Sequence, residues 1–156
     1  MAAAIEGMTK VGGYNYDWGS VNQPDMAKRT YPSALILLGD PDGAETAVEN
    51  LDEVGSGAGQ QLYHQRALFT IIVQGEITSE TTNPNYSINP VHVKALDDLL
   101  ELFGTNFAIG DTCDKIMFRT MRRNLKRSGD IFKPGEMPTA WDVYYQQDRT
   151  NPEQIG

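Results

Sequence analysis

The segment that most constrains the fold is "VHVKALDDLLELFG" at 91–104. Its apolar residues recur at the three- and four-residue spacing of an amphipathic helix, and they are Val91, Ala95, Leu96, Leu99, Leu100 and Phe103. Pro90 favours a helix start and Gly104 favours a helix end. Because an apolar stripe must pack against another layer, we predict a helix that lies on a sheet. Its predicted partners in the sheet are Leu35, Leu37, Phe69 and Ile71.

Several other segments have the character of strands. The longest, "QQLYHQRALFTIIVQGEIT" at 60–78, is rich in β-branched and aromatic residues. "YNYDWG" at 14–19 alternates aromatic with polar residues, and "SALILLGDP" at 33–41 is a short apolar run closed by turn residues. A short helix is expected at about 2–10. The predicted fold class is α+β, with a mainly antiparallel or mixed sheet packed by one long amphipathic helix and a short N-terminal helix.

The segment "MFRTMRRNLKRSGD" at 117–130 fits two patterns. Met117, Met121 and Leu125 have the spacing of a basic amphipathic helix, whereas the alternation that begins at Ile116 and Phe118 fits a strand. Turn residues follow, and "TAWDVYYQQD" at 139–148 alternates again. Two such segments around a turn-rich connection favour a strand, and we predict that the fold ends in a β-hairpin.

Acidic and basic residues are segregated along a chain whose net charge is −8. Residues 40–53 hold six acids and no base, whereas residues 115–127 hold six bases and no acid. The acidic block continues into "GSGAG", and this composition predicts an exposed, mobile loop at about 40–59. Opposite blocks on one chain suit contacts between unlike surfaces of identical copies. The alternative is that both blocks are solvated and contact nothing.

Length and composition set broader limits. A chain of 156 residues is expected to form a single domain that spans 1–156. The longest aliphatic run, "ALILL", is far shorter than the roughly 20 residues of a membrane span, so no membrane association is expected. The first residues lack the pattern of a secretory signal. Cys113 is the single cysteine, which excludes an intramolecular disulfide.

No set of residues in the sequence forms a catalytic pattern. His64 and His92 have no Cys or His at metal-ligand spacing. Acidic neighbours should raise the pKa of Cys113 and so keep its thiol unreactive. "DPDGAE" begins like a calcium loop but lacks the later oxygen ligands. We therefore expect no enzyme activity, no cofactor and no metal.

Five segments, taken in order, resemble one family of bacteriophage proteins. They are "YNYDWGSVNQPDMAKRTYPSALILL", "YHQRALFTIIVQGEI", "INPVHVKALDDLLELFG", "DTCDKIMFRTM" and "PTAWDVYYQQDRTNP". Together they resemble the tail terminator family of long-tailed phages, also called tail completion or minor tail proteins. The resemblance covers about residues 12–152. It rests on the order of strands and helix and on no catalytic motif.

The resemblance implies an α+β subunit of which six copies form a ring in the virion. The ring caps the finished tail tube, ends its polymerisation and offers its other face to the head-completion or neck complex. It implies assembly in the host cytoplasm, and DNA that passes through the ring without specific binding. The expected N-terminal helix is short for this family. The alternatives are a neck or head-completion (connector) protein and a small nucleic-acid-binding module that uses 115–127.

A ring of identical copies needs one patch that meets a different patch on the next copy. The two charge blocks have suitable charges for that contact or for a contact with a partner ring. The predicted contact residues are Arg119, Arg122, Arg123, Lys126 and Arg127 in the basic block and Glu49, Asp52 and Glu53 in the acidic block. The implied partners are other copies of the chain, the tail tube protein and the head-completion or neck protein.

Overall fold

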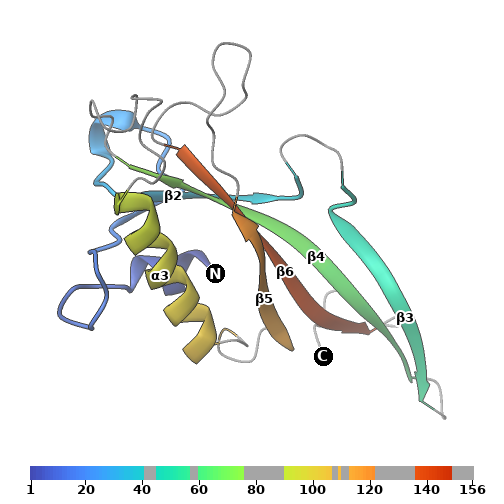
Figure 1. Ribbon diagram of the computed structural model, residues 1–156. Coiled ribbons are helices and arrows are strands. Elements are labelled where there is room, and N and C mark those ends of the chain that lie inside the picture. The colour runs from blue at the N-terminus through green and yellow to red at the C-terminus, as the bar shows by residue number, and fades with distance from the viewer. Residues whose placement is uncertain are drawn as a thin grey trace.

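The computed structural model describes residues 1–40, 45–56, 60–75, 90–106, 109, 113–121 and 136–148. These residues form an α+β fold with a six-stranded mixed sheet and two α-helices (Figure 1). The helices are α1 (Ala2–Glu6) and α3 (Pro90–Thr105), with a short 3-10 turn at Met26–Lys28. The strands are β1 (Ser20–Val21), β2 (Ser33–Leu38), β3 (Val48–Ser56), β4 (Gln60–Gln74), β5 (Lys115–Met121) and β6 (Glu136–Asp148).

The long strand β4 organises the sheet. The strand order is β1-β2-β4-β6-β5, and β3 also pairs with β4. β6 pairs with β4 from Leu62 to Gln74 and so occupies nearly the whole of one side of it. The other side is shared, because β3 pairs with β4 up to Ala67 and β2 pairs with it from Phe69 onward. β1 and β2 are parallel, and every other pairing in the described sheet is antiparallel.

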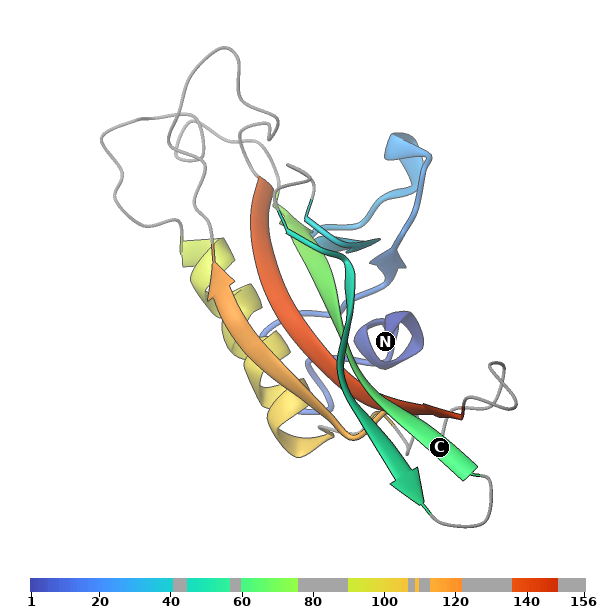
Figure 2. The same ribbon diagram turned by 90° about the vertical axis from the view of Figure 1, so that its right-hand side faces the viewer.

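The hydrophobic core lies between α3, α1 and one face of the sheet. Trp141 of β6 is at its centre, with its ring edge-on to Phe103 at 4.9 Å and to Phe118 at 5.2 Å between ring centroids. Leu99 of α3 and Ile71 of β4 are fully buried in the same cluster. Figure 2 shows α3 running alongside β5, the strand that carries Phe118. The core therefore joins the outermost strand to the helix through aromatic contacts.

The face that α3 turns to the core is narrower than the sequence predicts. Leu99 and Phe103 are buried and Leu96 is partly buried, but Leu100 is 39% exposed, so its predicted burial is wrong. Successive helical residues differ by about 100° around the axis, which puts Leu100 at the margin of a stripe centred on Leu99. Ala95 and Leu102 belong to the same buried stripe, and His92 and Asp98 are buried as well.

Two of the predicted sheet partners lie on the wrong face. The core cluster takes Ala34 and Ile36 from β2, and it does not include Leu35 or Leu37. Successive residues of a strand point to opposite faces, so one strand cannot offer both pairs to α3.

The N-terminal segment differs from its prediction. Residues 14–19, predicted as a strand, are not a strand, and the adjoining strand is Ser20–Val21. The backbone N–H groups of Asn15 and Tyr16 donate to the side chain of Asp98, so they are not available to a neighbouring strand. The first helix ends at Glu6, earlier than the predicted end at about residue 10.

The predicted loop at about 40–59 is wrong at 48–56. Residues 48–56 form β3, which pairs antiparallel with β4 from Val48 opposite Ala67 to Ser56 opposite Gln60. The composition was misleading because a strand at the margin of a sheet tolerates exposed charged side chains. Residues 41–44 and 57–59 lie outside the described residues.

The strand predicted around Phe118 is confirmed as β5, which pairs antiparallel with β6. Residues 122–135, which would connect the two strands, lie outside the described residues, so the terminal hairpin stays a prediction. Among the helices that the structure describes, none has the length and apolar character to cross a membrane.

Candidate interaction surface

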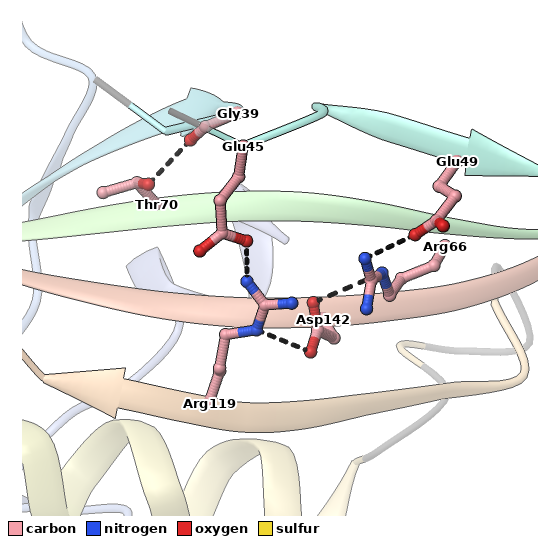
Figure 3. Close-up of polar contacts among 7 residues, drawn as sticks. All are labelled: Gly39, Glu45, Glu49, Arg66, Thr70, Arg119 and Asp142. Carbon is pink, nitrogen blue, oxygen red and sulfur yellow. Dashed lines mark hydrogen bonds and ion pairs between the residues drawn. The ribbon is translucent and has the colours of Figure 1, made fainter. Parts of the chain in front are cut away.

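Five charged side chains form a continuous series of ion pairs on the sheet (Figure 3). In spatial order they are Glu45, Arg119, Asp142, Arg66 and Glu49. Trp141 and Val143 face the core, so Asp142 between them faces the opposite side, away from α3. We call this series the ionic chain.

Asp142 is the centre of the ionic chain. Its Oδ2 accepts a hydrogen bond from Nε of Arg119 at 3.1 Å, and its Oδ1 lies 3.8 Å from Nε of Arg66. Each guanidinium then reaches an outer carboxylate. Arg66 Nη2 lies 2.5 Å from Oε2 of Glu49, and Arg119 Nη1 donates to Oε2 of Glu45.

Strand register places four of the five residues. Glu49 of β3 is directly opposite Arg66 of β4. Arg66 is opposite Tyr144, two residues from Asp142 on the same face of β6, and such diagonal neighbours are within reach of long side chains. On β5 the register shifts between Phe118 and Thr120, so Arg119 is the extra residue of a bulge. A bulge redirects a side chain, and here the guanidinium of Arg119 meets Asp142.

Glu45 is placed by the segment that links β2 to β3. Thr70 of β4 donates its hydroxyl hydrogen to the carbonyl oxygen of Gly39 at 2.7 Å (Figure 3). The backbone N–H of Gly39 donates to the carbonyl oxygen of Leu68, and the backbone N–H of Leu68 donates to the carbonyl oxygen of Ala47. Gly39 has a φ of +91°, a left-handed conformation that favours glycine. These bonds fix both ends of the segment beside β4.

Solvent exposure increases from the centre of the ionic chain to its two ends. Asp142 is only 8% exposed, whereas Glu45 and Glu49 are exposed. Hydrogen bonding to Glu45, together with the negative charge of Asp142, raises the pKa of Arg119, so its guanidinium stays charged. Removing one partner of a buried pair is costly because the other charge stays buried. Asp142 therefore depends on its two arginines more than the outer glutamates do.

A second polar cluster ties the N-terminal segment to α3. The carboxylate of Asp98 is fully buried. Its Oδ1 accepts from the backbone N–H of Asn15 at 2.7 Å and from Nδ2 of Asn15 at 2.9 Å. Its Oδ2 accepts from the backbone N–H of Tyr16 at 3.1 Å and from Nε1 of Trp18 at 2.9 Å. We call this cluster the Asp98 clamp.

Neither cluster has the composition of a catalytic site. Every carboxylate of the ionic chain is bound to an arginine, so the arrangement offers ion pairs and no activated nucleophile. Among the described residues, no three His, Cys, Asp or Glu side chains come together as metal ligands. Burial, and to a smaller extent the charge of Asp114, raises the pKa of Cys113. The direction agrees with the sequence prediction, although burial is the larger cause.

The structure separates the predicted contact residues into three groups. Arg119 and Glu49 belong to the ionic chain, where their partners are Glu45, Asp142 and Arg66 of the same chain. Asp52 and Glu53 are in β3, in register with His64 and Tyr63. Arg122, Arg123, Lys126 and Arg127 lie outside the described residues. The two charge blocks thus meet within one chain through Arg119 and Glu45.

Sequence reasoning missed Arg66, Asp142 and Asp98 as members of polar clusters. Arg66 and Asp142 each stand beside apolar residues of a strand, in "QRALF" and "AWDVY", and such a charge needs a partner when the sheet is covered. Asp98 had the same signal, because it interrupts the apolar run "ALDDLLELF". Their partners are distant in sequence, so the pattern could not identify them.

No model of a known protein family matches the chain, and no curated protein matches it.

Proposed function

We propose that this protein is a structural, non-enzymatic component of a long-tailed phage virion. It is a tail terminator whose copies form a ring, six to a ring, at the head-proximal end of the tail. The ring caps the tail tube, ends its polymerisation and provides the docking surface for the head or neck. It assembles in the host cytoplasm, and DNA passes through it without specific binding.

The observation that carries the proposal is the placement of charge on the two outermost long strands. β3 contains Glu49, Asp52 and Glu53 and no base, whereas β5 contains Lys115 and Arg119 and no acid. β3 is bound to β4 and β5 is bound to β6, so the two strands lie on opposite sides of the β4–β6 pair. A closed ring requires two unlike, complementary surfaces on each subunit, and opposite charges favour their association.

The ionic chain supports a structural role over nucleic-acid binding. A phosphate-binding site needs guanidinium groups that can turn to the phosphate backbone. Arg119 is engaged by Glu45 and Asp142, and Arg66 is engaged by Glu49 and Asp142. A net charge of −8 also disfavours a tight grip on DNA.

The finer features of the predicted fold belong to the same proposal. One long amphipathic helix covers the sheet, and β5 and β6 form the two arms of a terminal hairpin. The antiparallel pairing of β5 with β6 supports the hairpin. The fully buried Leu99 and the exposed Glu101 and Lys94 of α3 support an amphipathic helix.

The proposal is tested with the purified 17.3 kDa chain and the tail tube protein of the same phage. Sedimentation velocity gives the number of copies in the assembly, and negative-stain electron microscopy shows whether it is a six-fold ring with a central hole. Polymerising tubes are then mixed with the protein, and tube length and the occupancy of tube ends are measured. We expect rings at one end of each tube and shorter, more uniform tubes.

Other outcomes separate the alternatives. A ring that binds head-completion protein but leaves tube growth unchanged supports the neck alternative. A monomer that retards DNA on a gel, with strong dependence on salt, supports the nucleic-acid-binding module. Either result contradicts the terminator function.

A further inference from the structure

The two outermost long strands each have an open side. Among the described residues, β3 pairs only with β4, and β5 pairs only with β6. The other side of each strand therefore presents backbone N–H and C=O groups to which no described strand is bonded. Such a row of groups is a template for pairing with another chain.

These strands also carry apolar side chains that the fold leaves exposed. Val48 and Leu51 of β3 are 40% and 46% exposed, and Met117 and Phe118 of β5 are 46% and 37% exposed. Monomeric proteins commonly protect such strands with lysine or proline. β3 contains neither residue, and β5 contains a single lysine, Lys115. Each strand therefore exposes apolar side chains close to charged residues, a combination that suits a partner surface of opposite charge.

The formal charges of the two strands are opposite. Glu49, Asp52 and Glu53 give β3 a charge of three negative units, because the strand has no base. Lys115 and Arg119 give β5 a charge of two positive units, because it has no acid. Glu49 and Arg119 are paired within the chain, so the opposite charges outside the ionic chain are those of Asp52 and Glu53 on β3 and of Lys115 on β5. Like strands of two copies would repel one another, and unlike strands would attract.

Strand directions fix how two copies would meet. Going from β3 to β4, from β4 to β6 and from β6 to β5 takes three antiparallel steps. An odd number of such steps means that β3 and β5 run in opposite directions. A second copy that continues the sheet in the same orientation therefore brings its β3 antiparallel to β5 of the first. Antiparallel pairing is the slightly more stable arrangement per residue.

We propose that β5 of one copy pairs antiparallel with β3 of the next copy, so that the sheet continues from subunit to subunit. The occupant of each open strand is a second copy of this chain. The contact is head-to-tail, so it leaves one β3 and one β5 free at the ends of any open assembly, and a ring satisfies both. The proposal rests on the proposed function only for the closure of that ring.

Each strand has a bulge that limits the length of the contact. The register of β3 is regular from Asp52 to Ser56, and that of β5 is regular from Lys115 to Phe118. Main-chain pairing between copies is confined to these short runs, because a bulge bends and twists the strand. A short contact makes association reversible, and the opposite charges select the partner strand.

A charge swap tests the contact. Asp52→Lys changes the charge of β3 from −3 to −1, and Lys115→Glu changes that of β5 from +2 to 0. Neither residue belongs to the ionic chain. Each single variant should associate about tenfold more weakly than the wild type in sedimentation velocity. The thermal melt of Asp52→Lys should stay close to that of the wild type, and that of Lys115→Glu should fall slightly, because Lys115 Nζ lies over the Tyr144 ring, 4.8 Å from its centroid. An equimolar mixture of the two variants should recover pairwise association, since the unchanged β5 of the Asp52→Lys variant and the unchanged β3 of the Lys115→Glu variant form a wild-type contact.

Matched controls carry the same charge changes elsewhere. Lys10→Glu and Asp97→Lys alter exposed residues outside β3 and β5 and should associate as the wild type does. The proposal is overturned if the single variants associate normally, or if the mixture stays as weak as its components. It is also overturned if the wild-type chain is monomeric at every concentration.

The swap and the tube assay fail in different ways. If the charge swap alters association as expected but the rings leave tube growth unchanged, the strand contact is supported and the terminator function is contradicted. If both single variants cap tubes as well as the wild type does, the terminator function is supported and the strand contact is contradicted.

Discussion

Two buried aspartates, Asp98 in α3 and Asp142 in β6, are held by partners of different kinds. Asp98 accepts four hydrogen bonds, all from uncharged N–H groups of Asn15, Tyr16 and Trp18. Asp142 lies between two guanidiniums, and its Oδ1 accepts no hydrogen bond from the described residues. The carboxylate of Asp98 is fully hydrogen-bonded by neutral N–H groups, whereas that of Asp142 depends on two long, charged arginine side chains.

The difference separates a structural cluster from a surface cluster. The donors of the Asp98 clamp come from adjacent residues, so the carboxylate fixes the course of a segment that has no strand partner there. The arginines of the ionic chain have flexible stems and end on exposed glutamates, so their ion pairs can rearrange at modest cost. We infer that the clamp maintains the fold, whereas the ionic chain shapes the face of the sheet opposite α3.

The largest effect is expected at the clamp. Asp98→Ala removes four hydrogen bonds and leaves the buried indole N–H of Trp18 and two backbone N–H groups without their acceptor. Each unsatisfied buried donor costs about 1–3 kcal/mol, so the free energy of unfolding should fall by about 3–5 kcal/mol. Urea denaturation measures the loss. Asp97→Ala is the control, because Asp97 is the exposed neighbour in the same helix, and it should change stability by less than about 0.5 kcal/mol.

An intermediate effect is expected at the centre of the ionic chain. Arg119→Met leaves Asp142 buried with only Arg66, 3.8 Å away, and should cost about 1–3 kcal/mol. Asp142→Asn in the same protein removes the buried charge and should recover part of the loss. The coupling is measured by urea denaturation of the two single variants and the double variant. Additive losses would show that Arg119 and Asp142 do not interact in solution.

A smaller effect is expected at the ends of the ionic chain. Glu45→Gln and Glu49→Gln each weaken one exposed ion pair, and such pairs contribute about 0–1 kcal/mol. The difference from the wild type should shrink as salt is added, because screening weakens exposed pairs most. Thermal melts at low and high ionic strength measure it. A loss as large as that of Arg119→Met would mean that the outer glutamates are as important as Asp142.

Elements with local sequence signals were predicted correctly, whereas an element that depends on a distant partner was not. α3 spans Pro90–Thr105, close to the boundaries that Pro90 and Gly104 indicate, because helical spacing and end signals are local. The apolar strand β2 was recognised for the same reason. β3 was not, because its acidic residues have the composition of a loop and only pairing with β4 makes it a strand.

The clusters themselves depend on contacts between distant residues. Asn15 and Asp98 are 83 positions apart, and Glu45 and Arg119 are 74 positions apart. A charge in an apolar segment indicates that a partner is needed, but the fold decides which partner it is. The predicted contact between the charge blocks of different copies stays a prediction, and the sequence did not predict that Arg119 would pair with Glu45 of its own chain.

The last prediction concerns two tyrosines with different neighbours, and it has the smallest expected effect. Burial and the charge of Asp98 raise the pKa of Tyr16, whereas burial is the cause for Tyr145. A raised pKa in the folded state means that the unfolded state loses its proton first as pH rises. The stabilising contribution is therefore complete below the unfolded pKa of about 10, and it is lost as pH rises through the folded value.

Tyr16→Phe should therefore make the alkaline decline in the free energy of unfolding less steep. In a spectrophotometric titration, the absorbance difference between the wild type and Tyr16→Phe gives the pKa of Tyr16, and Tyr145→Phe gives that of Tyr145. Asp98→Asn removes the charge but keeps a side chain of similar shape, so it should lower the pKa of Tyr16 and leave that of Tyr145 unchanged. If both values stay the same in Asp98→Asn, burial alone sets the pKa of Tyr16, and the carboxylate charge of the clamp does not reach the tyrosine hydroxyl.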